Sequence, residues 1–176
     1  MHNTDELNRF LAGVEKRAYS MAMVTVKNSE DALDIVQDVM LTLATKYAQK
    51  PAAEWKPLFY KILRNRITDF HRKQQRSRGI FAWFSGADDD PLDAAAAPAS
   101  STPVAQTEAQ NNTAAISQAL AELPERQRQA FMLRAWEGLG VRETAAAMGC
   151  SQGSVKTHYS RAIAGLQTRL GRLGEP

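Results

Sequence analysis

Residues 141–162 read VRETAAAMGCSQGSVKTHYSRA, and this stretch predicts two helices that meet at a tight turn. Gly149 is placed to end the first helix in a left-handed conformation, and Ser151 is placed to cap the second. One stripe of the second helix is apolar and is expected to be its buried side: Val155, Tyr159, Ala162 and Leu166. The layout is that of a helix-turn-helix, in which the second helix can enter the major groove of DNA.

The opposite side of the second helix carries basic and small hydrogen-bonding groups, which suit a groove lined with phosphates. The face comprises Gly153, Ser154, Lys156, Thr157, Ser160 and Arg161. A polar face opposite an apolar stripe also describes an ordinary surface helix. The turn, the cap and the basic face occur together in the right order, so we favour DNA binding. Cys150 is the only cysteine and has no metal-ligating neighbour, so we interpret it as a small turn residue.

The composition places the chain among globular proteins of a reducing compartment. It has 176 residues, of which 44% are hydrophobic, and it has one cysteine. No apolar run is long enough to cross a bilayer, and the amphipathic start lacks the apolar stretch of a signal peptide. We therefore expect a cytoplasmic protein with no membrane insertion.

Charge is distributed in blocks along the chain. Residues 61–78 contain seven lysines and arginines and one acid, whereas residues 79–125 contain no lysine or arginine. Residues 77–112 are rich in alanine, proline and acidic groups without a regular apolar period, which predicts a flexible acidic linker. We expect an all-α protein with two small helical domains, 1–76 and 113–176, because no strand alternation persists.

The segment at 29–47 predicts a helix that begins with Ser29 as its cap. Its core stripe is expected to contain Leu33, Val36, Met40, Leu43 and Tyr47, widened by Ile35 and Val39. The other side is acidic and carries Asp34, Gln37, Asp38 and Leu41. This face is either solvated or a docking site for a basic partner protein, and it does not suit DNA.

The segment at 55–76 is basic, in contrast to the acidic face of the helix before it. Leu58, Ile62, Ile67 and Phe70 are expected to pack inward. The remaining surface combines cations with rings and an amide: Tyr60, Lys61, Arg64, Asn65, Arg66, His71, Arg72 and Lys73. Such a surface can bind a single strand with unstacked bases, although the rings can equally be core and the cations solvated. The apolar residues 80–84, IFAWF, are expected to fold back on the first domain or to pack on a partner.

Together these segments resemble the extracytoplasmic-function type of bacterial RNA polymerase sigma factor, over nearly the whole chain. DALDIVQDVMLTL at 31–43 resembles the helix that docks on the polymerase clamp, which implies docking roles for Asp34, Gln37 and Asp38, with Leu41 on the same face. LFYKILRNRITDFHRK at 58–73 resembles the promoter-melting element, with Asn65 at the asparagine that captures a flipped base of the minus-ten sequence.

The stretch at 123–162 resembles the domain that binds the minus-thirty-five element, which gives Lys156, Thr157, Ser160 and Arg161 groove-facing roles. The resemblance implies two partners, core RNA polymerase and promoter DNA. An anti-sigma factor is a candidate third partner, because many relatives have one. The free protein is expected to be a monomer with no catalytic residues, cofactor or metal.

Two other functions fit the sequence less well. A helix-turn-helix transcriptional regulator would bind duplex DNA without the polymerase, but the helix at 31–43 argues against it. A helical hydrolase would need a catalytic constellation, and the three histidines are scattered with no metal-ligand spacing.

Overall fold

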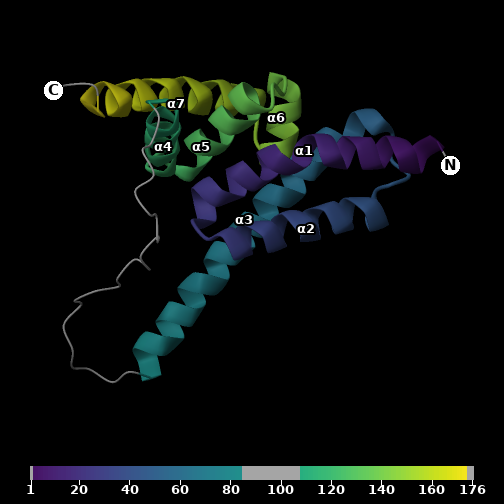
Figure 1. The fold of residues 1–176 in the computed structure, drawn as a ribbon, viewed down its shortest axis with the longest axis horizontal. Coiled ribbons are helices and arrows are strands. Elements are labelled where there is room, and N and C mark those ends of the chain that lie inside the picture. The colour runs from purple at the N-terminus through teal and green to yellow at the C-terminus, as the bar shows by residue number, and fades with distance from the viewer. Residues whose placement is uncertain (1, 85–107, 174–176) are drawn as a thin grey trace.

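The computed structural model describes residues 2–84 and 108–173, whose regular elements are all helices (Figure 1). The first half contains α1 (His2–Val26), α2 (Ser29–Lys46) and α3 (Ala52–Phe84). The second half contains α4 (Glu108–Ala121), α5 (Glu125–Phe131), the π-helical segment η1 (Met132–Trp136), α6 (Val141–Met148) and α7 (Gln152–Leu173). The expected all-α class is confirmed. None of these described helices is long and apolar enough to cross a membrane.

The first half is built from amphipathic helices whose apolar residues recur every three or four positions. From α1 the buried side chains are Leu7, Leu11, Val14, Ala18, Met21, Ala22, Val24 and Val26. The N-cap of α2 is Asn28, whose side chain accepts a hydrogen bond from the Asp31 amide at 3.0 Å. The expected cap, Ser29, is instead the first helical residue, because Asn28 has the extended backbone that a cap requires.

The buried stripe of α2 is narrower than its sequence predicts. Its centre is formed by Ala32, Ile35, Val36, Val39 and Leu43. Leu33 was expected in the core but is 45% exposed. Successive residues are about 100° apart around a helix, so Leu33 lies to one side of a stripe that runs through Ala32 and Val36.

The phase of α3 also differs from the prediction. Its inward face is formed by Trp55, Phe59, Tyr60, Leu63 and Ile67, all of which are buried. The predicted Leu58, Ile62 and Phe70 lie at the edges and are half-buried. The ring of Phe10 on α1 lies 5.9 Å from Trp55 and 6.1 Å from Phe59, between centroids. The Tyr60 ring packs edge-on against Phe59, with centroids 5.2 Å apart, so Tyr60 belongs to the core and not to the expected outer surface.

The second half contains the expected helix-turn-helix. Gly149 ends α6 with φ +62°, and Ser151 Oγ accepts a hydrogen bond from the Ser154 amide at 3.1 Å before α7 begins. Both predicted turn residues are therefore confirmed. At the other end of α6, the Glu143 side chain accepts from the Gly140 amide at 2.9 Å and closes the first turn.

The two halves pack against each other in this structure. One apolar cluster contains Tyr60 and Leu63 from α3 together with Met132, Leu133 and Met148 from the second half. Helix α3 packs on α6, and the end of α1 contacts α4 (Figure 1). The C-terminal part of α3 projects away from the rest of the molecule (Figure 1).

The ends of α3 and α4 extend into the interval 77–112 that was predicted as a linker. Helix α3 continues to Phe84, and α4 begins at Glu108. Residues 85–107, which make up most of that interval, lie outside the described residues. Of the segment at 80–84, Ile80 is 58% exposed, and the other four side chains lie outside the description. The domain boundaries stay a prediction.

Candidate nucleic-acid and partner interfaces

Helix α7 presents a basic outer face to solvent. Among the predicted residues, Gly153, Lys156, Thr157, Ser160 and Arg161 are exposed. Neither Lys156 nor Arg161 forms a salt bridge with any described residue. Both cations are therefore available for phosphates or base edges in this conformation. Ser154 is half-buried, and its hydroxyl lies 2.9 Å from that of Ser151, so it supports the turn.

The inner side of α7 is held by packing, which fixes the outer face. Val155, Ala162 and Leu166 are buried, as predicted. The half-buried Tyr159 ring is stacked on Phe131, with centroids 6.2 Å apart. The guanidinium of Arg134 lies 5.6 Å from the centroid of the Tyr159 ring. These contacts hold α7 at a fixed rotation, because turning the helix would expose its apolar stripe.

Helix α2 presents an acidic face with apolar side chains in it. Asp34, Gln37 and Asp38 are exposed, and Leu41 is 62% exposed. Leu33 lies two turns before Leu41 on the same side of the helix and adds a second exposed apolar group. An exposed leucine flanked by carboxylates suits a partner surface that offers both apolar and basic groups.

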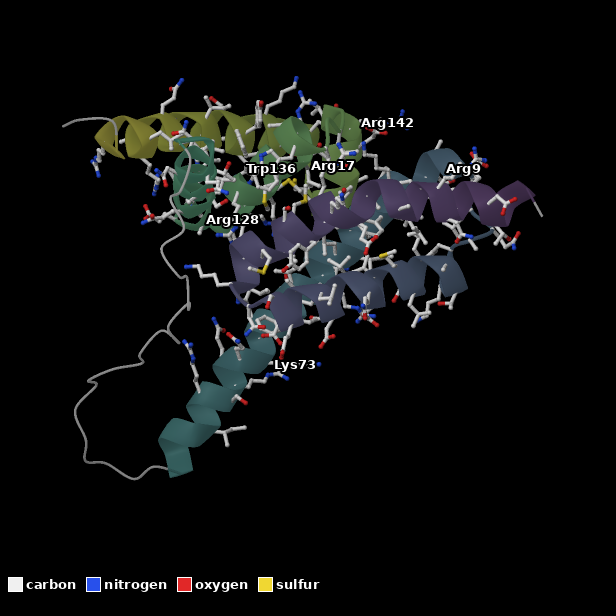
Figure 2. The ribbon with its side chains drawn as sticks, in the orientation of Figure 1. Arg9, Arg17, Lys73, Arg128, Trp136 and Arg142 are labelled. Atoms are coloured by element: carbon white, nitrogen blue, oxygen red, sulfur yellow. The ribbon has the colours of Figure 1, made fainter. Side chains whose placement is uncertain are left out.

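The predicted single-strand residues on α3 are divided between surface and interior. Lys61, Asn65, Arg72 and Lys73 are exposed, whereas Arg64, Arg66 and His71 are half-buried. Arg66 pairs with Asp38 of α2, with 2.5 Å between Nε and Oδ2. Lys73 projects from the free part of α3 (Figure 2).

Tyr60 lies apart from that surface, because it is only 2% exposed. Burial, followed by the nearby Glu137 carboxylate, raises the pKa of the Tyr60 hydroxyl above its ordinary value. In this conformation the ring cannot stack on a base.

Asn65 lies at a polar cleft between α3 and α5. The cleft is lined by Arg64, Asn65, Thr68, Asp69, Arg72, Glu125, Arg126 and Gln129. Arg64 donates to the Asn65 side-chain oxygen at 2.9 Å and also to the main-chain oxygen of Met148 at the end of α6. Arg126 donates to the same Met148 oxygen at 2.7 Å. Desolvation, followed by the charge of Arg126, lowers the pKa of Arg64 below the ordinary arginine value.

Glu137 is a buried acid that sequence reasoning did not single out. It follows η1, and its side chain is 0% exposed. Arg17 Nε lies 2.9 Å from one carboxylate oxygen, and Lys56 Nζ lies 3.5 Å from the other. Lys56 also donates to the Glu137 main-chain oxygen at 2.8 Å. The acid belongs to the second half and both cations belong to the first.

Figure 2 labels Arg17 on α1 and Trp136, the last residue of η1, and Arg17 contacts Glu137 directly after it. No local pattern links Arg17, Lys56 and Glu137, since Lys56 and Glu137 are separated by 81 positions. Among the described residues, no three histidine, cysteine, aspartate or glutamate side chains lie together so as to hold a metal ion.

Two family models match separate parts of the chain. The model of sigma-70 region 2 matches residues 8–77, and the model of sigma-70 region 4 matches residues 113–166. RNA polymerase sigma factor SigV of Bacillus subtilis (strain 168) is 31% identical over 153 residues, which cover 86% of this chain and 83% of SigV. ECF RNA polymerase sigma factor SigM of Mycobacterium tuberculosis is 30% identical over 163 residues, which cover 90% of this chain and 74% of SigM.

Solved structures show the same arrangement of helices. The sigma factor RpoE, in complex with the anti-sigma factor NepR from Bartonella quintana, matches with a TM-score of 0.62 and 28% identity, covering 93% of this chain and 96% of RpoE. CnrH, in complex with the cytosolic domain of CnrY, matches with a TM-score of 0.59 and 20% identity, covering 94% of this chain and 88% of CnrH. The second likeness concerns the fold alone.

Proposed function

The chain belongs to the sigma-70 family, as a sigma factor of the extracytoplasmic-function type, and we propose that it uses one face, on α2, to bind core RNA polymerase and two faces, on α3 and α7, to bind promoter DNA. The chain binds core RNA polymerase and promoter DNA and directs promoter-specific transcription initiation. The observation that carries the proposal is that acidic and basic faces are separated on one chain, with the acids on α2 and the cations on α3 and α7. Each face suits a partner of opposite charge.

The outer face of α7 binds the minus-thirty-five element as duplex DNA. Lys156 and Arg161 are exposed and are without salt bridges among the described residues. Gly153, Thr157 and Ser160 form the surface between them, where short groups let the helix approach the groove closely. Ser154 contributes through the cap, since its amide is bound to Ser151.

The acidic face of α2 binds the core polymerase. Asp34, Gln37 and Asp38 supply charge and hydrogen bonding, and Leu41 supplies the apolar contact at the centre. Leu33 extends this contact along the same side of α2.

The basic face of α3 binds the opened minus-ten strand. Lys61, Arg64, Arg66, Arg72 and Lys73 bind phosphates, His71 stacks on a base, and Asn65 binds the edge of a flipped base. Unpairing and flipping a base cost a few kcal/mol, which these contacts offset in the strand-separated state. We leave Tyr60 out of this set, because its ring is part of the core.

The same proposal covers catalysis, inhibition and the place of action. The phosphodiester chemistry belongs to the core polymerase, so this chain contributes binding energy and no catalytic group. An anti-sigma factor binds this chain and holds it inactive; the similar sigma factor RpoE has been solved in complex with the anti-sigma factor NepR. The site of action is the cytoplasm, where bacterial RNA polymerase works.

The test is transcription in vitro. The purified chain is mixed with core RNA polymerase from the organism that encodes it and with genomic DNA fragments, and transcript starts are mapped. Discrete starts that share two upstream elements are expected. Specific binding of duplex DNA without any core complex or new starts would contradict the proposal, and would favour a helix-turn-helix regulator instead.

A further inference from the structure

The polar cleft between α3 and α5 has the size of a small-molecule site. Its volume is about 420 Å³, within the range of about 300–1,000 Å³ that is usual for such sites. The charged and amide groups of its two walls are Arg64, Asn65 and Arg72 on α3, and Glu125 and Arg126 on α5. The cleft is therefore large enough for a small organic ligand and offers polar groups from two helices to bind it.

Two guanidinium groups of this cleft share one hydrogen-bond acceptor. Arg64 and Arg126 both donate to the main-chain oxygen of Met148, Arg126 at 2.7 Å. That oxygen has no formal charge, and neither arginine forms a salt bridge with a described residue. Burial, followed by the charge of Arg126, lowers the pKa of Arg64, as expected for two cations held close together. An anion placed beside both groups would offset this repulsion.

The balance of charges in the cleft limits the kind of anion that fits. The cleft contains three positive and two negative side chains: Arg64, Arg72, Arg126, Asp69 and Glu125. The small positive excess suits a ligand with one phosphate group. A strand with several phosphates would bring some of them near the two carboxylates, which would repel them. A ligand whose other groups donate hydrogen bonds would instead bind the carboxylates favourably.

A nucleotide combines these features, because it carries a phosphate and a base with hydrogen-bonding edges. A guanidinium binds phosphate oxygens through paired N–H groups, and its plane can stack on a base. A glutamate accepts a hydrogen bond from the exocyclic amine of cytosine, and Glu125 is exposed at the cleft. The Asn65 oxygen accepts from Arg64 at 2.9 Å, so the amide nitrogen is the part of this exposed side chain that can donate to a base.

We propose that this cleft binds a free nucleoside monophosphate whose base carries an exocyclic amine. Arg126 donates to the phosphate, Arg64 adds its positive charge, and Glu125 accepts from the amine. One nucleotide of a single strand offers the same phosphate and base, but its neighbouring phosphates would lie near Asp69 and Glu125. The site does not depend on the function proposed above for α3. Under that function, a bound nucleotide occupies the cleft at Asn65 and competes with the minus-ten strand.

The test is an amide NMR titration of the isotope-labelled full chain, without polymerase, with deoxycytidine 5′-monophosphate and deoxyuridine 5′-monophosphate. The cytidine nucleotide is expected to bind with a Kd below about 1 mM and to shift the resonances of residues that line the cleft. The uridine nucleotide has a carbonyl oxygen in place of the amine, which would face the Glu125 carboxylate. It is therefore expected to bind about tenfold more weakly.

Arg126→Gln is compared with Arg172→Gln, because each variant removes an exposed cation from the second half and Arg172 does not line the cleft. R126Q is expected to weaken binding of the cytidine nucleotide about tenfold, and R172Q should bind it as the wild type does. Glu125→Gln is expected to make the two affinities similar, because glutamine can accept from an amine or donate to a carbonyl. Helix content measured by circular dichroism shows that each variant is folded.

A 12-nucleotide single strand of deoxycytidine, titrated in the same way, distinguishes a strand from a free nucleotide. Shifts at the cleft with the strand, and none with the free cytidine nucleotide, would overturn the proposal and assign these contacts to the strand. Equal affinities of wild type for the two nucleotides, or of R126Q and R172Q for the cytidine nucleotide, would also overturn it. The transcription experiment tests the proposed function separately, so either proposal can fail while the other holds.

Discussion

At the scale of single residues, Lys156 and Arg161 stand out because they project from a helix whose other side is fixed by packing. Val155 and Ala162 are fully buried beneath them. A side chain on a rigid helix loses little further freedom on binding, so its contacts contribute most of their interaction free energy to affinity.

Replacing Lys156 or Arg161 by alanine is expected to weaken binding to the minus-thirty-five duplex. A cation that reads a base edge contributes about 1–3 kcal/mol, and its loss relaxes sequence preference at one position. Loss of a cation that contacts a phosphate instead lowers the magnitude of the salt slope by about one. Fluorescence anisotropy over a series of salt concentrations separates these cases. Arg172→Ala, an exposed cation in the last turn of α7, is the control and should behave as wild type. Unchanged affinity and salt slope in both variants would contradict the assignment of this face.

Asn65→Ala is expected to reduce promoter opening and to leave duplex binding intact. The exposed amide lies at the polar cleft, and it matters only once a base has left the stack. Permanganate footprinting of the holoenzyme on a promoter found by transcript mapping measures opening. Asn111→Ala removes an exposed amide from α4 and serves as the control. Equal opening by N65A and N111A would remove Asn65 from base capture.

At the scale of elements, the turn between α6 and α7 contributes to two structures at once. Gly149 gives it a left-handed residue, and the Met148 oxygen beside it accepts from Arg64 and Arg126. The turn therefore shapes the helix-turn-helix and also anchors the second half to α3.

Gly149→Ala is expected to destabilise the fold by about 1–2 kcal/mol, because a residue with a Cβ is strained at φ +62°. The new Cβ would also lie 3.4 Å from Arg64 Nη1. Gly171→Ala is the matched control, since a Cβ there meets no atom within 4 Å and alanine favours the helix. Urea denaturation should show loss of stability for G149A and none for G171A. Equal midpoints would show that the left-handed turn contributes nothing.

The elements also show what could be predicted from sequence and why. The helix-turn-helix was predictable because Gly149 and Ser151 are local signals, one for the end of a helix and the other for the start of the next. The phase of α3 was not, because Phe59 and Tyr60 suit either a core or a stacking surface. Phe10, which packs on Phe59, decides between them from another helix.

The contact around Glu137 lay beyond sequence reasoning for a different reason. Its partners come from α1 and α3, and a lone glutamate after η1 reads as an ordinary surface acid. Exposure of the α7 face was predictable from helical periodicity. The hydrogen bond from Arg64 to the Met148 oxygen was not, because it depends on how the two halves of the chain pack together.

At the scale of the whole molecule, the packing of the two halves leaves the face proposed for polymerase binding exposed and touches the surface proposed for the minus-ten strand. Leu41 is 62% exposed on α2, while Arg64 is held against the second half.

Leu41→Ala is expected to weaken binding of the chain to core polymerase by about 1–2 kcal/mol, since it removes apolar area that the complex would bury. Stability should hardly change, because the side chain is mostly in water in the free chain. Biolayer interferometry with immobilised core measures the affinity. Ile116→Ala, which trims a 38% exposed side chain on α4, is the control. Matching affinities for L41A and I116A would exclude the α2 face as the docking site.

The hydrogen bond from Arg64 to the main-chain oxygen of Met148 also affects how strongly the free chain binds to DNA of any sequence. A chromosome offers on the order of 10⁶ or more competing non-specific sites. The affinity of a protein for these sites increases with the number of phosphates that it neutralises. The cations on the outer face of α7 are exposed and can contact phosphates, whereas Arg64 is already bound to the Met148 oxygen. Non-specific affinity for chromosomal DNA is therefore expected to be lower in this arrangement of the halves than in one that frees Arg64.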